Sequence, residues 1–319
     1  MRSRQQGVDG QKQERLKPAR SEVEGLPQGT HLICAPRFPP QTVPQYKSLG
    51  ATPASTAEGR LYERWSSEIG IGDGDLFATE ADVSFIAMCG RYGRYSRKER
   101  IEQLLGTRIQ GGEDLRIRYN VCPGTKDWVI RQSATSSALR FEHFEWGLLP
   151  YWAKNPKATR RPVNARAETV AEKPMFRDLL RYRRCVVPID GYYEWRTTSS
   201  GKVPFWFHLK SGEPFFLAGL WDCWHAGEPD AVLSYILMTT EPNGLAAKVH
   251  DRMPVMLNAR DVPRWLDPAI KEAEAVSDLL RPYPGGEMEA HPVSRRVNKP
   301  ENEGPELIEV DNSVRELWT

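Results

Sequence analysis

Short apolar runs rich in aromatic residues, separated by turn residues, occupy most of the sequence after residue 88. The clearest are RCVVPID (184–190), GYYEWRT (191–197), VPFWFHL (203–209), PFFLAGLWDCW (214–224) and AVLSYILMTT (231–240). Runs of this length and composition, bounded by glycine, proline or polar residues, are typical of β-strands. A chain with this pattern must bury a sheet made of many short strands.

Helical spacing of apolar residues occurs at only a few places between these runs. We expect helices in RKERIEQLLG (97–106), where Gly106 suits a C-cap, and in KPMFRDLLRYR (173–183). NARDVPRWLD (258–267) resembles the start of a short helix, and AIKEAEAVSDLLRP (269–282) predicts one that ends at Pro282. Because helices and strands do not alternate strictly, the pattern predicts an α+β fold with a curved, largely antiparallel sheet.

Residues 1–87 have a different composition from the rest of the chain. They are polar and rich in Pro, Ser and Gly, as in CAPRFPPQTVPQYKSLGATPASTAEG (34–59). Such a segment buries too little apolar surface to offset its conformational entropy. The sequence therefore predicts a disordered extension over residues 1–87 and one folded domain over residues 88–319.

Charge, cysteine content and motifs exclude several classes of protein. The net charge is only +2, so any basic surface must come from local arrangement. The 5 cysteines contain no CxxC pair, which disfavours zinc ribbons and thioredoxin-type sites. No run approaches the roughly 18 apolar residues of a membrane span. P-loop, HExxH, GxSxG and GxGxxG motifs are absent from the sequence. We expect no metal, no cofactor and no membrane partner.

Two residues have neighbours that suggest reactivity. Cys89 precedes Gly90 in a stretch rich in arginine, and nearby positive charge favours a thiolate. A buried structural cysteine is the simpler interpretation of this residue. Glu194 lies among aromatic residues in GYYEW, so its carboxylate is either paired structurally or raised in pKa for proton transfer.

Two further candidates lie in turns. Asn164 opens NARAET (164–169), a stretch that ordinary helix capping also explains. His250 stands beside a carboxylate and a guanidinium in HDRMP (250–254), which makes it the best acid or base candidate among the 6 histidines. Composition alone does not show whether these four residues meet in space.

The same residues lie in strings that resemble the SRAP family of SOS-response-associated peptidases, or abasic-site-processing proteins. The strings occur in family order and cover essentially the whole chain from residue 88. They are MCGRY (88–92), RYNVCPG (118–124), WGLLPYWAK (146–154), NARAETVAEKPMFR (164–177), RRCVVPIDGYYEWR (183–196), MTTEPN (238–243), HDRMPVML (250–257) and HPVSRRVNKPENEGPELIE (291–309).

This resemblance implies a compact α+β domain around a barrel-like antiparallel sheet, with a basic groove for single-stranded DNA. It also implies covalent capture of abasic sites by an N-terminal cysteine, with associated self-processing peptidase and lyase-type activity. Cys89 would be the nucleophile, and Asn164, Glu194 and His250 its active-site partners. The DNA contacts would come from Arg91, Arg166, Trp195, Thr239 and Arg252, with Trp152 as a further exposed aromatic residue.

The resemblance also implies why a cysteine is needed. An α-amine has a pKa of about 7.7–8.0, so part of it is neutral at physiological pH, unlike a lysine at about 10.4. It can form a Schiff base with the sugar aldehyde, and the neighbouring thiol can close a thiazolidine ring. In this chain, however, residues 1–87 and Met88 precede Cys89.

Three alternatives account for this departure from the family pattern. Translation starts at Met88, or the extension is cleaved between Met88 and Cys89, or the protein binds DNA without crosslinking. We favour the first, because the motif begins at a methionine and residues 1–87 lack a core-forming pattern.

Other activities also fit the residues themselves. A thiol peptidase acting in trans and a non-catalytic reader of modified or single-stranded DNA are the alternatives. For the crosslinking protein we expect a monomer that acts on single-stranded DNA with abasic sites, with replication-fork proteins as further partners. The expected location is the cytoplasm in association with the nucleoid, or the nucleus in a eukaryote.

Overall fold

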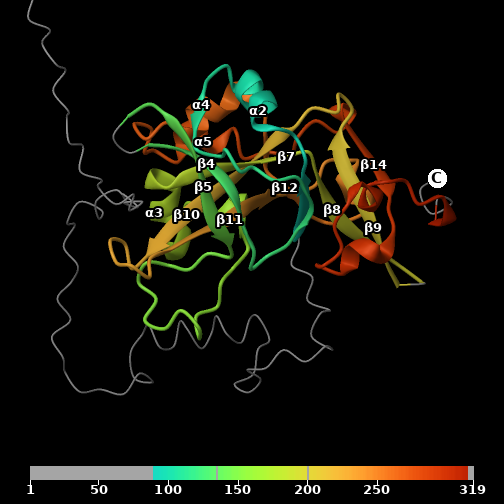
Figure 1. Ribbon diagram of the computed structural model, residues 1–319, viewed down its shortest axis with the longest axis horizontal. Helices are drawn as coiled ribbons and strands as arrows, with labels where there is room; N and C mark the ends of the chain where they lie inside the picture. The colour runs from blue at the N-terminus through green and yellow to red at the C-terminus, as the bar shows by residue number, and fades with distance from the viewer. Residues whose placement is uncertain (1–88, 134–135, 200, 315–319) are drawn as a thin grey trace, which may run out of the picture. The chain divides into compact units, whose positions relative to one another are not determined.

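The computed structural model describes residues 89–133, 136–199 and 201–314. The disordered extension predicted for residues 1–87 lies outside the described residues. The described residues form an α+β fold with two β-sheets and a few helices (Figure 1). The fold class predicted from the sequence is confirmed.

The smaller sheet is antiparallel throughout and carries strand β1 directly after Cys89. Its order is β14, β9, β8, β1, β3. In β1, Arg91 pairs with Tyr193 and Tyr92 with Tyr192 of β8. The strands are β1 (Arg91–Arg94), β3 (Arg118–Val121), β8 (Gly191–Thr198), β9 (Gly201–Leu209) and β14 (Met288–Pro292).

The larger sheet closes on itself. Strands β5, β4, β7, β10 and β11 follow one another, and β11 then pairs in parallel with β5 through Ser234–Glu145 and Tyr235–Trp146. This closure makes the barrel-like body that the resemblance implied. Its strands are β4 (Lys126–Gln132), β5 (Leu139–Trp146), β7 (Arg184–Ile189), β10 (Phe215–Trp224) and β11 (Val232–Thr240). Short strands added to it are β2 (Ile109–Gln110), β6 (Asn164–Arg166), β12 (Met253–Pro254) and β13 (Met256–Leu257).

Helices cover one side of this barrel, as Figure 1 shows for α2, α4 and α5. Gly106 ends α2 in the left-handed conformation at φ 63°, and Pro174 opens α3, as the sequence predicts. The helices are α2 (Lys98–Leu105), α3 (Pro174–Tyr182), α4 (Val262–Leu266) and α5 (Glu274–Ser277). Single 3-10 turns are η3 (Ala167–Thr169), η4 (Ala246–Lys248), η5 (Ala259–Asp261), η6 (Gly285–Glu287), η7 (Arg295–Asn298) and η8 (Pro305–Leu307).

The long helix predicted over residues 269–282 is wrong, because only α5 forms there. Side-chain donors occupy carbonyls that a longer helix would use. The Arg184 guanidinium donates to the carbonyl of Ile270 at 2.8 Å, and Arg264 donates to the carbonyl of Ala275. Tertiary hydrogen bonds therefore take up one carbonyl before α5 and one within it.

Alternation along the strands separates three apolar clusters. In β7, Val186 packs with the helices, whereas Val187 packs into the barrel interior. This interior cluster continues onto one face of the smaller sheet, which we call its inner face; Tyr192 and Phe205 lie there. The opposite, outer face carries Tyr193, Trp195 and Trp206, covered by Val293, Val297 and Leu307 of the C-terminal segment.

Candidate active site

The site begins where Cys89 meets Glu194. Because β1 pairs with β8, the residue two positions before Arg91 lies beside the residue that follows Tyr193. The backbone nitrogen of Cys89 donates to Oε1 of Glu194 at 2.5 Å. Cys89 is 3% exposed and Glu194 2% exposed, so the contact is shielded from water. Two residues far apart in the sequence thus form a buried amide–carboxylate pair.

Cys89 also has an unusual backbone conformation. Its φ is 51°, in the left-handed region that residues with a side chain rarely adopt. Such a conformation persists only where the surroundings impose it, and it is concentrated at functional sites. The pairing of β1 with β8 and the hydrogen bond to Glu194 are the constraints visible here.

Burial governs the ionisation of both side chains. It raises the pKa of the Cys89 thiol well above its ordinary value, and the Glu194 charge adds to this, while Arg252 acts in the opposite direction. Burial also raises the pKa of Glu194, against the lowering influence of His250 and of the hydrogen bonds from Cys89. Burial thus outweighs the arginines that lie nearby in the sequence, in keeping with the simpler interpretation of Cys89 as a buried cysteine, and the raised pKa of the carboxyl suits proton exchange.

His250 lies within electrostatic range of Glu194, and its side chain is one-quarter exposed (25%). Its Nδ1 is 2.9 Å from Oδ1 of Asp251 and 3.1 Å from the backbone nitrogen of Arg252. A protonated Nδ1 donates to the carboxylate of Asp251, whereas an unprotonated Nδ1 accepts from Arg252. The ring thus has a partner in either protonation state, which suits an acid or base.

Arg252 is engaged by a carboxylate that the sequence analysis did not single out. It donates to Oε1 and Oε2 of Glu168 at 2.8 and 2.9 Å, and to the carbonyl of Thr239 at 2.8 Å. This contact lowers the pKa of Glu168, so the carboxylate stays ionised. The guanidinium expected to bind phosphate is held by an anion of the protein itself.

Asn164, Arg166 and Thr239 come together through the pairing of β6 with β11. Asn164 lies opposite Leu237 and Arg166 opposite Thr239. Ala165, between them, packs with the helices, so Asn164 and Arg166 lie on the opposite face of β6. Arg166 is exposed and Thr239 is buried. This face therefore adds Asn164 and Arg166 to the group around Arg252.

Arg91 and Trp195 lie on the outer face of the smaller sheet instead. Arg91 donates to Oδ1 of Asn120 at 2.8 Å and to the carbonyls of Val297 and Asn298. Trp195 donates through Nε1 to Oδ1 of Asn298 at 2.8 Å and is only 5% exposed, so the expectation that its ring is exposed is wrong. Trp152, by contrast, is 54% exposed. The DNA contacts assigned to Arg91 and Trp195 stay predictions.

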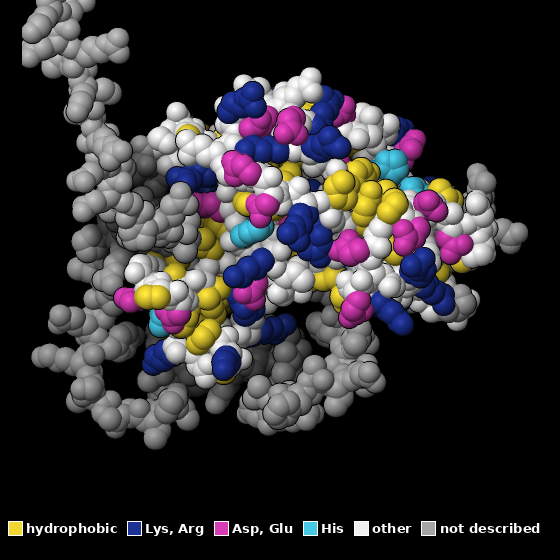
Figure 2. Space-filling view, viewed as in Figure 1, with side chains coloured by type: hydrophobic (Ala, Val, Ile, Leu, Met, Phe, Trp, Pro, Cys, Tyr) yellow, Lys and Arg dark blue, Asp and Glu magenta, His cyan; other side chains and the backbone are white. Residues whose placement is uncertain are grey.

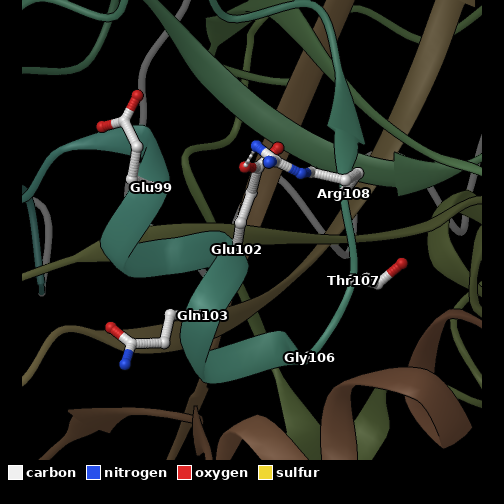
Figure 3. A pocket seen from close by; sticks show the side chains of 6 residues that line it. All are labelled: Glu99, Glu102, Gln103, Gly106, Thr107 and Arg108. Carbon is white, nitrogen blue, oxygen red and sulfur yellow. Dashed lines mark hydrogen bonds and ion pairs between the residues drawn. The ribbon is translucent and has the colours of Figure 1, made fainter.

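The visible surface does not concentrate positive charge. In the view of Figure 2, Lys and Arg side chains are interspersed with Asp and Glu over the face that it shows. A surface pocket beside α2, seen in Figure 3, is also separate from the site: its walls include Glu102 and Arg108, which pair at 3.0 Å. Neither the visible surface charge nor this pocket marks the site; its defining feature is the buried contact between Cys89 and Glu194.

The described residues carry neither a cluster of metal ligands nor a membrane-spanning helix. Among residues 89–133, 136–199 and 201–314, no group of at least three His, Cys, Asp or Glu is placed to hold a metal ion. Over those ranges, no helix has the length and apolar character needed to cross a membrane.

Two residues of the site were missed by sequence reasoning. Glu168 lies inside NARAET, and Tyr192 lies two positions before Glu194, hence on the same face of β8. Strand alternation could have placed Tyr192 beside the carboxylate. Only the structure could identify Glu168 as the partner of Arg252, because η3 and the 250–252 turn are far apart in the sequence.

Comparisons with known proteins identify the family of the chain. The family model described as SOS response associated peptidase (SRAP) matches residues 88–300. The abasic site processing protein YoqW of Bacillus subtilis (strain 168) is 38% identical over 224 residues, covering 70% of this chain and 99% of YoqW. The abasic site processing protein YedK of Escherichia coli (strain K12) is 31% identical over 231 residues, again covering 70% and 99%. A crystal structure of a protein from Bacteroides thetaiotaomicron matches with a TM-score of 0.60 and 26% identity, covering 70% of this chain and 100% of that one.

Proposed function

Because the chain belongs to the SOS response associated peptidase (SRAP) family, we propose that it processes abasic sites in single-stranded DNA by linking them covalently to Cys89. The relatives named abasic site processing proteins support the substrate class. The observation that carries the proposal is the buried contact between the nitrogen of Cys89 and Glu194. It places an acid or base against the atom that would attack.

The proposed reaction begins with a free α-amine on Cys89. Its nitrogen attacks C1′ of the ring-opened sugar, the C=O electrons move to oxygen, and a carbinolamine forms. Glu194 takes a proton from nitrogen and returns one to the oxygen, which leaves as water and gives an imine. The thiol then adds: sulfur bonds to C1′, and its proton passes to the nitrogen. The product is a thiazolidine, with one water lost overall.

The ionisation of the site supports this order of steps. A thiol with a raised pKa stays neutral and does not compete with the amine for the aldehyde. A carboxyl with a raised pKa can give up and accept protons closer to neutral pH than an ordinary glutamate. His250, within electrostatic range of Glu194, would act on the sugar oxygen or hydroxyl during ring opening.

The amine exists only when no peptide bond joins Cys89 to Met88. We assign its release to removal of Met88, either as an initiator methionine or by self-cleavage of a longer chain. The left-handed φ of Cys89 and the adjacent Glu194 support self-cleavage as a chemical option. Asn164 would hold the freed terminus, and Arg166 and Arg252 would hold phosphates of the strand.

A gel assay tests the proposal with variants of one residue. A chain that starts at Cys89 is incubated with single-stranded DNA carrying one abasic site, and a heat-stable shifted band is expected on a denaturing gel. Cys89→Ser keeps the amine but lacks the thiol, so borohydride should trap its imine while no heat-stable band forms without reductant. A chain that keeps residues 1–88 should give neither product.

The same assay separates the alternatives. A wild-type chain starting at Cys89 that binds the DNA without any covalent product would show a non-catalytic reader. A heat-stable band that persists in Cys89→Ala would place the nucleophile elsewhere and refute the proposal.

A further inference from the structure

Tyr192 carries a buried hydroxyl that has no hydrogen-bond partner within the described part of the chain. The residue is 1% exposed. Burying a hydroxyl without a partner costs stability, because the bonds it makes with water in the unfolded chain are not replaced. A phenylalanine would fill nearly the same space without this cost. The stability of the fold therefore does not explain why this position carries a hydroxyl, and a role in binding or catalysis is the alternative.

The hydroxyl lies on the same face of β8 as Glu194. Tyr192 pairs with Phe207 and Glu194 with Phe205, and both phenylalanines pack on the inner face of the sheet. Burial raises the pKa of Tyr192, and the ionisable groups of Cys89 and Glu194 add to this rise, which puts the hydroxyl within electrostatic range of both. It thus stays protonated, as a donor.

Neighbouring side chains fix the ring and leave its hydroxyl without a partner. The ring stacks on Phe207 with centroids 4.9 Å apart and planes at 6°. Tyr92 lies directly across on β1, but its own hydroxyl is 2.8 Å from both Asp127 and Tyr235. The donor of Tyr192 is therefore held in place, on the face of β8 that carries Glu194, without a partner of its own in the described residues.

We propose that the Tyr192 hydroxyl donates a hydrogen bond to the oxygen of the abasic-site aldehyde while the nitrogen of Cys89 attacks its carbon. The inference rests on the proposed function and names a further residue for it. As the N–C1′ bond forms, the C=O electrons move onto oxygen, and a fixed donor stabilises the charge that develops there. Glu194 supplies the proton with which that oxygen leaves as water, so Tyr192 keeps its own.

Tyr192→Phe tests this role in a chain that starts at Cys89. The rate of imine formation, measured by borohydride trapping in single turnover, should fall about 100-fold, the effect of removing one donor to a developing oxyanion. The affinity for intact single-stranded DNA should stay unchanged. The melting temperature should be unchanged or higher, because the variant loses an unsatisfied buried group.

Tyr193→Phe is the matched control, since its hydroxyl lies on the outer face and donates to the carbonyl of Tyr119 at 2.8 Å. This variant should lose thermal stability and trap the imine at the wild-type rate. Wild-type imine formation in Tyr192→Phe, with crosslinking intact in the unmodified chain, overturns this inference alone. No covalent product from the unmodified chain overturns the proposed function and this inference together.

Discussion

The two faces of strand β8 differ in how their polar groups are used. On the outer face, the hydroxyl of Tyr193 and the indole nitrogen of Trp195 each donate at 2.8 Å to a neighbouring oxygen. On the inner face, the hydroxyl of Tyr192 has no such partner in the described residues, and Glu194 is a buried carboxylate that binds the nitrogen of Cys89. The hydroxyls of two adjacent tyrosines on one strand thus differ: that of Tyr193 is hydrogen-bonded, and that of Tyr192 is not.

The contrast teaches how a strand can serve stability and chemistry at once. Satisfied groups lower the free energy of the fold, whereas unsatisfied groups are tolerated where a ligand completes them. The outer face anchors the C-terminal segment through Asn298 and the carbonyl of Val297. Substitutions on the outer face should therefore change stability, and substitutions on the inner face should change the reaction.

The largest effect is expected from Glu194→Gln on the inner face. Removing the proton-transfer group should slow crosslinking by about 100-fold, or about 2.7 kcal/mol in barrier height. Stability at neutral pH should not fall, because the variant no longer buries a charge. Rates come from single-turnover gels, and stability from thermal unfolding.

Asp190→Asn is the control for this variant. Asp190 is also a buried carboxylate with a raised pKa, caused first by burial, but it accepts hydrogen bonds from the backbone nitrogens of Tyr95 and Ser96. It should lose stability and keep the crosslinking rate. Equal rate losses in both variants would mean that the loss of any buried carboxylate slows the reaction, and would contradict the proton-transfer role of Glu194.

The pKa of Glu194 predicts how the stability of the wild type depends on pH relative to Glu194→Gln. Its pKa in the folded chain lies above its value in the unfolded chain, about 4.3. Below that value the carboxyl is protonated in both states, and the cost of a buried charge is absent. The stability of the wild type relative to the variant should therefore fall as pH rises from about 4 through the folded-state pKa. A difference that is flat with pH, measured by urea unfolding, would show that Glu194 is not perturbed.

Gly191→Ala tests the packing of the outer face and should cost about 2–3 kcal/mol. A Cβ at this position would lie 2.2 Å from Cζ2 of Trp206 and 2.6 Å from the carbonyl oxygen of Phe207. The ring and the strand would both have to move. Gly244→Ala is the control, because nothing lies within 4 Å of the added Cβ. Urea unfolding should show a lower free energy of unfolding for Gly191→Ala than for Gly244→Ala. Equal values would show that β8 and the ring of Trp206 shift to accommodate the added Cβ at little cost.

Trp195→Phe should have a smaller effect, about 1 kcal/mol of stability from the lost hydrogen bond to Asn298. Its affinity for single-stranded DNA should change little, because the ring is 5% exposed. Trp152→Ala, at a ring that is 54% exposed, is the comparison for affinity. Fluorescence anisotropy with a labelled oligonucleotide measures both. If Trp195→Phe lost more affinity than Trp152→Ala, the outer face would have to be part of the DNA-binding surface.

The smallest effect is expected from Glu168→Gln. This change removes the anion that holds Arg252, so the affinity for single-stranded DNA should rise about two- to fivefold, in keeping with an exposed ion pair worth up to about 1 kcal/mol. Glu228→Gln makes the same change of charge in the loop before β11, at the opposite end of that strand from Thr239. It should leave the affinity nearly unchanged. Weaker binding in Glu168→Gln would mean that Glu168 orients Arg252 for phosphate.

The sequence predicted the strands well because their apolar alternation is local. The runs that became β7, β8, β9, β10 and β11 were all identified. The helix predicted over residues 269–282 does not form in full, because Arg184 and Arg264, which both lie outside this segment, bind carbonyls within it. Local periodicity carries no information about such donors.

The candidate site was predicted only in part. Residue patterns singled out Cys89, Glu194 and His250, and the resemblance gave them roles. The fold places Glu194 against Cys89, with His250 in electrostatic range of Glu194. For the thiol, the sequence left two interpretations open, a thiolate favoured by nearby arginines and a buried cysteine, and burial, which raises its pKa, favours the second. The unpartnered hydroxyl of Tyr192 was likewise hidden, since alternation gives a face and says nothing of partners.

The intact mass of the covalent product tests the central claim most directly. A chain that starts at Cys89 is incubated with single-stranded DNA carrying one abasic site, and the complex is weighed without reductant. The account predicts the sum of protein and DNA less one water, with digestion placing the link on the N-terminal Cys89. A mass without the loss of one water, or a link on any residue other than Cys89, would contradict it.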